Sequence, residues 1–197
     1  MRTLPCRRPH ICGNKPKRMT RNIIVFGLLA GLVLGGFLAA MILMVNSNHH
    51  SMVSGMIFGY AMMLLAFSVI FVAIKNYRDK HLGGYISFGK AFGIGMGITL
   101  IASVLYTITW LILLQTVIPD FMDKYVAMQL EELRKAGKSA VEIQKHAKEM
   151  AQYQEMYKTW YGRALATVIE PLPVGIIVSL IAAGIMMRRR KKQVQVA

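Results

Sequence analysis

The chain has 197 residues, of which 55% are hydrophobic and only 17% are charged. This composition excludes a disordered chain, collagen and a coiled coil, and it is too apolar for a water-soluble domain. The formal net charge is +15, with only nine Asp and Glu residues in all, so the carboxylates on which many catalytic and metal sites depend are scarce. A bilayer-embedded protein is the class that remains.

Four segments lack Lys, Arg and Asp over lengths that can cross a bilayer: residues 23–45, 52–74, 91–118 and 164–187. As helices, the first two would be about 35 Å long and the third about 42 Å, against a hydrocarbon core of roughly 30 Å. Four such segments leave no amphipathic shell that could cover them in water. The sequence therefore predicts an all-α membrane protein with four transmembrane helices.

The basic residues are distributed asymmetrically around these spans. Seven lie in residues 1–21 without any acid, four lie in the loop of residues 75–90 with Asp79 as the one acid, and five lie in residues 188–192. Loops and tails rich in Lys and Arg stay in the cytoplasm. We therefore expect both tails (1–21 and 191–197) and the second loop to be cytoplasmic, with the membrane domain covering residues 22–190.

The first eighteen residues differ from the rest of the chain. They contain both cysteines, Cys6 and Cys12, and three prolines, without the apolar core of a signal peptide. Met19 and the following residues up to Asn22 have the form of a natural start just before the first span. We expect residues 1–18 to come from an over-extended start codon, and we expect no disulfide or metal role for the two cysteines.

The segment of residues 119–163 is nearly neutral and predicts an extracytoplasmic helical hairpin between spans three and four. Gly137 is typical of a helix end, and the spacing of Ser139 and Glu142 is that of a capping box, which predicts the start of a second helix. The apolar sides of the two helices should pack together and rest on the membrane surface or on a partner subunit. One stripe of the second helix would consist of Ile143, Ala147, Met150, Gln154 and Tyr157.

Several motifs resemble a known family. They are Asn76-Tyr-Arg-Asp79, the Gly-rich run from Leu82 to Phe92, Pro119-Asp-Phe121, and the run from Glu170 to Leu180. Over roughly residues 22–190 the chain resembles the bacterial membrane family catalogued as domain of unknown function 4199. The resemblance implies a small four-span protein of the bacterial inner membrane with no assigned activity.

Small residues recur at every fourth position in all four spans, a pattern that lets helix backbones approach closely. The predicted helix-packing residues are Gly27, Gly31, Gly35, Gly55, Gly59, Gly89, Gly93, Gly97, Gly175, Ser179 and Ala183. We favour packing within one four-helix bundle, while use of the same rows between two copies in a homo-oligomer stays open.

Glu170 is the one acidic residue within the predicted spans, and it directly precedes Pro171, with Pro173 two residues further on. An ionisable group in a span is a functional candidate by default. An acid before proline also suits the start of a helix, where it can cap free amides. We favour a structural cap or kink, and we keep an ion or proton site and a ligand contact as alternatives.

Other polar groups give weaker signals. Glu142, His146 and Glu149 line up on one helix face, but lysines lie between them and no fourth ligand is evident, so we interpret this face as solvated. His49 and His50 are interpreted as polar loop residues, and Lys90 as a side chain that reaches the cytoplasmic interface. No hydrolase, zinc-protease or phosphate-loop motif is present. We expect no catalytic residue, no metal, no cofactor and no nucleic-acid partner.

The function predicted from the sequence is a non-enzymatic structural or accessory role in the membrane, exerted through the external hairpin on a membrane-protein partner or a second copy. The alternative is a small oligomeric secondary transporter or channel in which Glu170 couples to an ion or proton, since proline-broken helices occur at transporter sites.

Overall fold

The computed structural model describes residues 15–45 and 52–187, with side-chain surroundings given for residues 18–43 and 57–187. Residues 1–14, which include Cys6 and Cys12, the two loop histidines and the basic run from residue 188 onward lie outside this range. So do the side-chain surroundings of Gly55. The predictions made for these residues are therefore not addressed by the structure.

Within the described ranges the chain is helical and has no strand. Helices α2 (Lys15–Val45) and α5 (Phe88–Thr116) are continuous. The second span consists of α3 (Met52–Phe67) and α4 (Val69–His81), and the fourth of α8 (Trp160–Ile169) and α9 (Pro171–Met186). Helices α6 (Phe121–Lys135) and α7 (Ala140–Lys158) lie between the third and fourth spans along the chain.

Among the residues that the structure describes, four helical stretches are long and apolar enough to cross a membrane, which confirms the predicted multi-pass architecture. Their limits are Arg18–Leu43, Ile57–His81, Phe88–Thr116 and Trp160–Met186. The second stretch runs beyond the predicted end at residue 74, because α4 continues through charged residues until Leu82 and the two positive-φ glycines that follow it. The fourth begins before residue 164, where Thr159 caps α8. Helix ends therefore follow caps and turns, and the ends of the apolar runs do not mark them.

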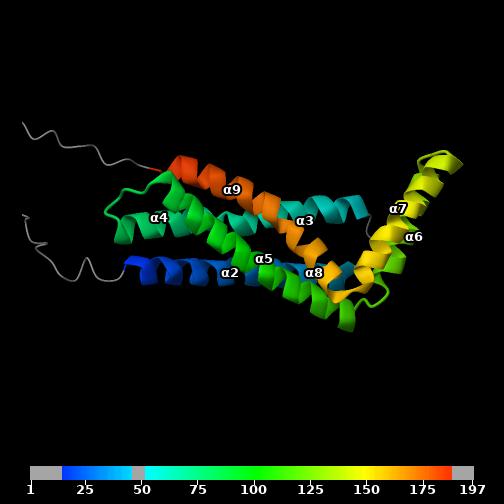
Figure 1. Ribbon diagram of the computed structural model, residues 1–197, viewed down its shortest axis with the longest axis horizontal. Helices are drawn as coiled ribbons and strands as arrows, with labels where there is room; N and C mark the ends of the chain where they lie inside the picture. Colours follow the sequence, from blue (N-terminus) through cyan, green and yellow to red (C-terminus); the bar gives the residue numbers. More distant parts are fainter. Residues whose placement is uncertain (1–14, 46–51, 188–197) are drawn as a thin grey trace, which may run out of the picture.

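The four spans run side by side and α5 is the central helix (Figure 1). It contacts α2, α4, α8 and α9. The start of α2, the end of α4 and the end of α9 lie at one end of the bundle, whereas α6 and α7 project from the other (Figure 1). We refer to these as the α4–α5 end and the α6–α7 end.

Helix α2 packs on α5 through a row of glycines. A Cβ atom added at Gly27 would lie 2.8 Å from Ile101 Cβ, and one added at Gly31 would lie 2.5 Å from Leu105 Cδ1. At Gly35 the same atom would lie 2.6 Å from the Thr109 hydroxyl. Any larger residue at these positions would push α2 away from α5, so the glycines set the distance between the two helices.

The contact between α5 and α9 is equally close, and glycines on both helices make it possible. A Cβ atom at Gly95 of α5 would lie 2.6 Å from Ser179 Oγ, and one at Gly175 of α9 would collide with the Thr99 side chain. Ser179 and Ala183 are fully buried. Gly97, on another side of α5, would meet Ile23 of α2 at 2.7 Å. Gly95, which the fourfold spacing did not include, thus makes one of the closest contacts.

Three of the glycines predicted to lie in helix contacts occupy open positions. A Cβ atom at Gly59, Gly89 or Gly93 would have no neighbour within 4 Å. Spacing alone predicts too many close contacts, because a glycine on a membrane helix faces lipid or a cavity as readily as another helix.

Replacing Gly31 by Ala should destabilise the bundle by about 1 to 3 kcal/mol, the usual cost of overpacking a tight contact. The matched control is Gly36→Ala on the same helix, where a Cβ atom meets nothing within 4 Å. That variant should be neutral or more stable by up to about 1 kcal/mol, because alanine favours helix over glycine. Thermal unfolding in detergent measures both. Equal unfolding temperatures for the two variants would contradict the packing described above.

Candidate functional site

The most distinctive feature of the α6–α7 end is a partly open cavity of about 560 Å³ that residues of the spans and of the α6–α7 pair line together. Its volume lies in the range of small-molecule sites. We call it the aromatic cavity because seven of its lining residues are aromatic: Phe37, Tyr106, Trp110, Phe121, Tyr125, Tyr153 and Tyr157. The remaining lining is Leu34, Leu38, Met41, Gly59, Met63, Met122, Met150, Ala166, Thr167 and Glu170.

Glu170 lies at the junction of α8 and α9 and lines this cavity. Its Oε2 atom accepts a hydrogen bond of 3.3 Å from the Tyr106 hydroxyl of α5. Glu170 as a residue is exposed. Among the described residues that line the cavity, Glu170 is the only carboxylate, and none is Lys, Arg or His.

The helix break places this carboxylate. Pro171 has no N–H and its ring disfavours the preceding helical turn, so the hydrogen bond that would reach the carbonyl of Thr167 is lost. Glu170 itself stays in the right-handed helical region (φ −64°, ψ −54°), and its side chain makes no capping hydrogen bond. Of the two forms of the favoured interpretation, cap or kink, the structure has the helix break at Pro171 and no capping hydrogen bond from the Glu170 side chain, which instead accepts from Tyr106.

Trp110 of α5 links the spans to the α6–α7 pair. Its Nε1 donates a hydrogen bond of 2.7 Å to the hydroxyl of Tyr157 at the end of α7. Its ring meets Phe121 of α6 edge-on, with centroids 4.9 Å apart. Burial raises the pKa of Tyr157 and that of Tyr153, so both phenols stay neutral at physiological pH. This side of the cavity is thus uncharged and held by directed contacts.

Local sequence signals explain how α6 and α7 are positioned. Gly137 adopts φ +69°, a conformation that favours glycine, and lies in the turn that follows α6. Ser139 and Glu142 form a reciprocal capping box at the start of α7, and the Ser139 backbone N–H lowers the pKa of Glu142 by hydrogen bonding. Gln154 of α7 donates to Asp123 of α6 at 2.7 Å. The two helices therefore pack as a unit, with Tyr157 buried.

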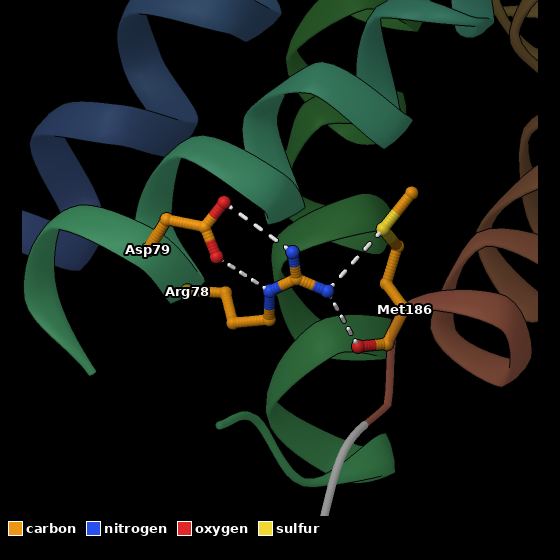
Figure 2. Close-up of polar contacts among 3 residues, drawn as sticks. All are labelled: Arg78, Asp79 and Met186. Atoms are coloured by element: carbon orange, nitrogen blue, oxygen red, sulfur yellow. Dashed lines mark hydrogen bonds and ion pairs between the residues drawn. The ribbon is translucent and has the colours of Figure 1, made fainter. Parts of the chain in front are cut away.

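At the α4–α5 end a cluster of polar side chains joins three helices. Arg78 of α4 is buried and binds Asp79 through two nitrogens, at 2.7 Å and 3.3 Å (Figure 2). Its third nitrogen donates to the backbone oxygen of Met186 at 3.4 Å and contacts the sulfur of that residue (Figure 2). A cation at the C-terminus of α9 also suits the helix dipole. Arg78 thus fixes the end of the fourth span to the second.

Asn22 of α2 extends the same cluster. It is buried, donates to the backbone oxygen of Ala73 at 3.1 Å, and accepts from Asn76 at 3.4 Å. The residues of the Asn76 to Asp79 motif therefore serve as attachment points between helices. Sequence reasoning missed this role in joining helices, although there was a signal: Asn76 and Arg78 follow shortly after the apolar run that ends at Ile74.

Several residues that the sequence offered as possible ligands or helix contacts lie away from the aromatic cavity or have other partners. Lys90 is exposed in the first turn of α5, at the end of the bundle opposite the aromatic cavity. Glu142 is engaged with Ser139, and His146 Nδ1 lies 3.5 Å from Glu149. No group of three or more His, Cys, Asp or Glu side chains within the described ranges could hold a metal ion. Gly59 lines the aromatic cavity and makes no helix contact there.

The fold is that of a multi-pass helical membrane protein whose fourth span is broken at a proline beside a cavity. Residues 25–188 match the family described as Protein of unknown function (DUF4199), and the chain belongs to that family. No curated protein and no solved structure shows significant similarity to the chain.

Substituting Arg78 with Ala should cost roughly 1 to 3 kcal/mol of unfolding free energy, because hydrogen bonds from a charged, buried donor to Asp79 and Met186 are lost. Lys80→Ala removes an exposed cation from the same helix and serves as the control. Denaturation in mixed micelles gives both values. A loss for Lys80→Ala as large as that for Arg78→Ala would show that the effect is one of helix charge and not of the contacts in Figure 2.

Proposed function

We propose that this protein is a non-enzymatic accessory protein of a bacterial inner membrane, and that its α6–α7 pair forms an extracytoplasmic hairpin that receives a ligand or partner. One observation carries the proposal: the aromatic cavity is lined by spans and hairpin together, with Met122, Met150 and Tyr153 on the hairpin side. A binding event there would change how the hairpin rests on the bundle.

The residues around the cavity support binding more than catalysis. An enzyme active site combines a nucleophile or base with groups that orient it and stabilise charge. Within the lining, Glu170 and the hydroxyls of tyrosines and Thr167 are the polar side chains besides the Trp110 indole, and Thr167 is occupied by the backbone oxygen of Arg163 at 2.8 Å. A single carboxylate beside aromatic rings is typical of recognition.

Exposed apolar side chains on the hairpin support a role in assembly. Val141 is 77% exposed, and Met128 and Met156 are also exposed, although they lie outside the four spans. Such residues on a segment beyond the hydrocarbon core can meet the membrane interface or another protein. We keep a membrane-protein partner and a second copy of the chain as candidates for this surface.

A second candidate function is secondary transport or conduction, with Glu170 as the coupling group. The specific observation in its favour is that Glu170 lies at a proline break within a span and lines a cavity, as groups at transporter sites do. Proton or solute flux into vesicles reconstituted with wild type or Glu170→Gln separates the two. Flux that depends on Glu170 would favour transport over the accessory role.

The proposed topology predicts a clear labelling pattern. With Cys6 and Cys12 replaced by Ser, a cysteine at exposed Lys138 should react with a membrane-impermeant maleimide on intact cells. A cysteine at exposed Lys80 should react only after permeabilisation, because the positive-inside rule places that loop in the cytoplasm. The reverse pattern would invert the protein in the membrane and place the hairpin in the cytoplasm.

Photo-crosslinking in native membranes tests the binding role. A benzophenone amino acid at Tyr153, in the cavity, should give a discrete adduct, whereas the same group at Val141 should not give that adduct. A Cβ atom at Gly59 meets nothing within 4 Å and the residue lines the cavity, so Gly59→Leu should reduce the space for a ligand and suppress the adduct. Gly36→Leu, at a position that is equally open to a Cβ atom but outside the lining, should leave the adduct unchanged. An adduct insensitive to Gly59→Leu, or none at Tyr153, would refute binding in the cavity.

A further inference from the structure

The aromatic cavity offers two kinds of contact that favour the same ligand. The first is a group of aromatic rings: Tyr106, Trp110 and Tyr153 come from two different helices and line one space. Aromatic faces attract cations, most strongly when water is excluded, and rings grouped around a space form the cages that bind quaternary ammonium ions.

The second contact is the carboxylate of Glu170. None of the described lining residues is cationic, so the Glu170 carboxylate gives the lining a negative formal charge. The hydroxyl of Tyr106 donates to Oε2 and orients the group, and Glu170 as a residue is exposed. Since no cation neutralises the carboxylate, a positively charged ligand would be attracted and an anion repelled.

Other ligand classes fit less well. A hard metal ion such as Ca²⁺ or Mg²⁺ needs several oxygen ligands, and the described lining supplies one carboxylate. A sugar or another strongly polar solute needs many hydrogen bonds, whereas the lining is mainly Leu, Met, Phe and other apolar side chains. The volume of about 560 Å³ accommodates a ligand with a sizeable apolar body.

We propose that the aromatic cavity binds an organic cation with an apolar body, such as an alkyl- or arylammonium compound, through the Glu170 carboxylate and the rings of Trp110 and Tyr153. This inference rests on the proposed binding function and names its ligand class. The ammonium group could belong to a free solute or to a lipid headgroup, because the cavity lies where the spans meet the hairpin.

The test uses a matched pair of probes, the cation tetraphenylphosphonium and the anion tetraphenylborate, which share size and shape and differ in charge. Equilibrium dialysis is done with the full chain in dodecyl maltoside micelles, which carry neither charge nor amine. Saturable binding of tetraphenylphosphonium is expected, with tetraphenylborate weaker by roughly tenfold or more. Equal affinity for both probes, or no saturable phosphonium binding, would overturn the proposal.

Variants then assign the contacts. Glu170→Gln should weaken phosphonium binding on the order of tenfold, while Glu155→Gln, on an exposed ion pair with Lys158 at 2.6 Å, should not. Tyr153→Leu should weaken it roughly two- to fivefold, and Tyr153→Phe, which keeps the ring, should restore it. Because Tyr153 is partly exposed on α7, its variants are informative even if Glu170→Gln fails to fold. Binding unaffected by both Glu170→Gln and Tyr153→Leu would refute the site.

Added lipid distinguishes the two sources of the cation. Phosphatidylethanolamine in the micelles should compete with phosphonium if a headgroup is the ligand, whereas phosphatidylglycerol, which lacks the amine, should not. The Tyr153 photo-adduct separates this inference from the proposed binding function. If Gly59→Leu abolishes the adduct but excess tetraphenylphosphonium does not reduce it, the cationic ligand is rejected and the binding function stands. If neither Gly59→Leu nor excess tetraphenylphosphonium reduces the adduct, both the ligand class and the binding function are rejected.

Discussion

The close approach of α5 to its neighbours is the constraint on which the remaining structure depends. In hydrocarbon, helices gain no hydrophobic energy by associating, so contact area and short distance must hold the bundle together. The glycines of α2 against Ile101, Leu105 and Thr109, and those of α5 and α9 against Ser179 and Thr99, provide that distance. With α2 and α9 held on two sides of α5, the ends of all four spans are positioned.

Hydroxyl groups are placed in this core in a way that suits an apolar solvent. Thr99, Thr107 and Thr167 are buried, and each donates to a backbone oxygen four residues earlier in its own helix. Ser103 and Ser179 are buried without a hydrogen-bond partner for their oxygens among the described groups. Ser179 is nonetheless required to be small, since Gly95 lies against it.

The two ends of the bundle are built differently. At the α4–α5 end, hydrogen bonds from Arg78 of α4 to Met186 of α9 and from Asn22 of α2 to Ala73 of α4 join the helices, and Asp79 pairs with Arg78 within α4. At the α6–α7 end, aromatic contacts predominate, the fourth span is interrupted at Pro171, and Glu170 lies in the lining of the aromatic cavity. Hydrogen bonds between helices at the α4–α5 end and a cavity at the α6–α7 end fit the proposed binding at the α6–α7 end.

The sequence by itself determined that the helices are apolar enough for a lipid bilayer and how many could span it, because the length of apolar runs and the placement of charges depend only on local composition. It also predicted the Ser139 to Glu142 cap, whose partners are three residues apart. It could not determine which glycines lie in contacts, why Gly59 faces a cavity, or that Glu170 meets Tyr106 from a helix 64 residues away along the chain. Those features depend on which helix face meets which neighbour, and only the tertiary packing decides the rotation of each helix.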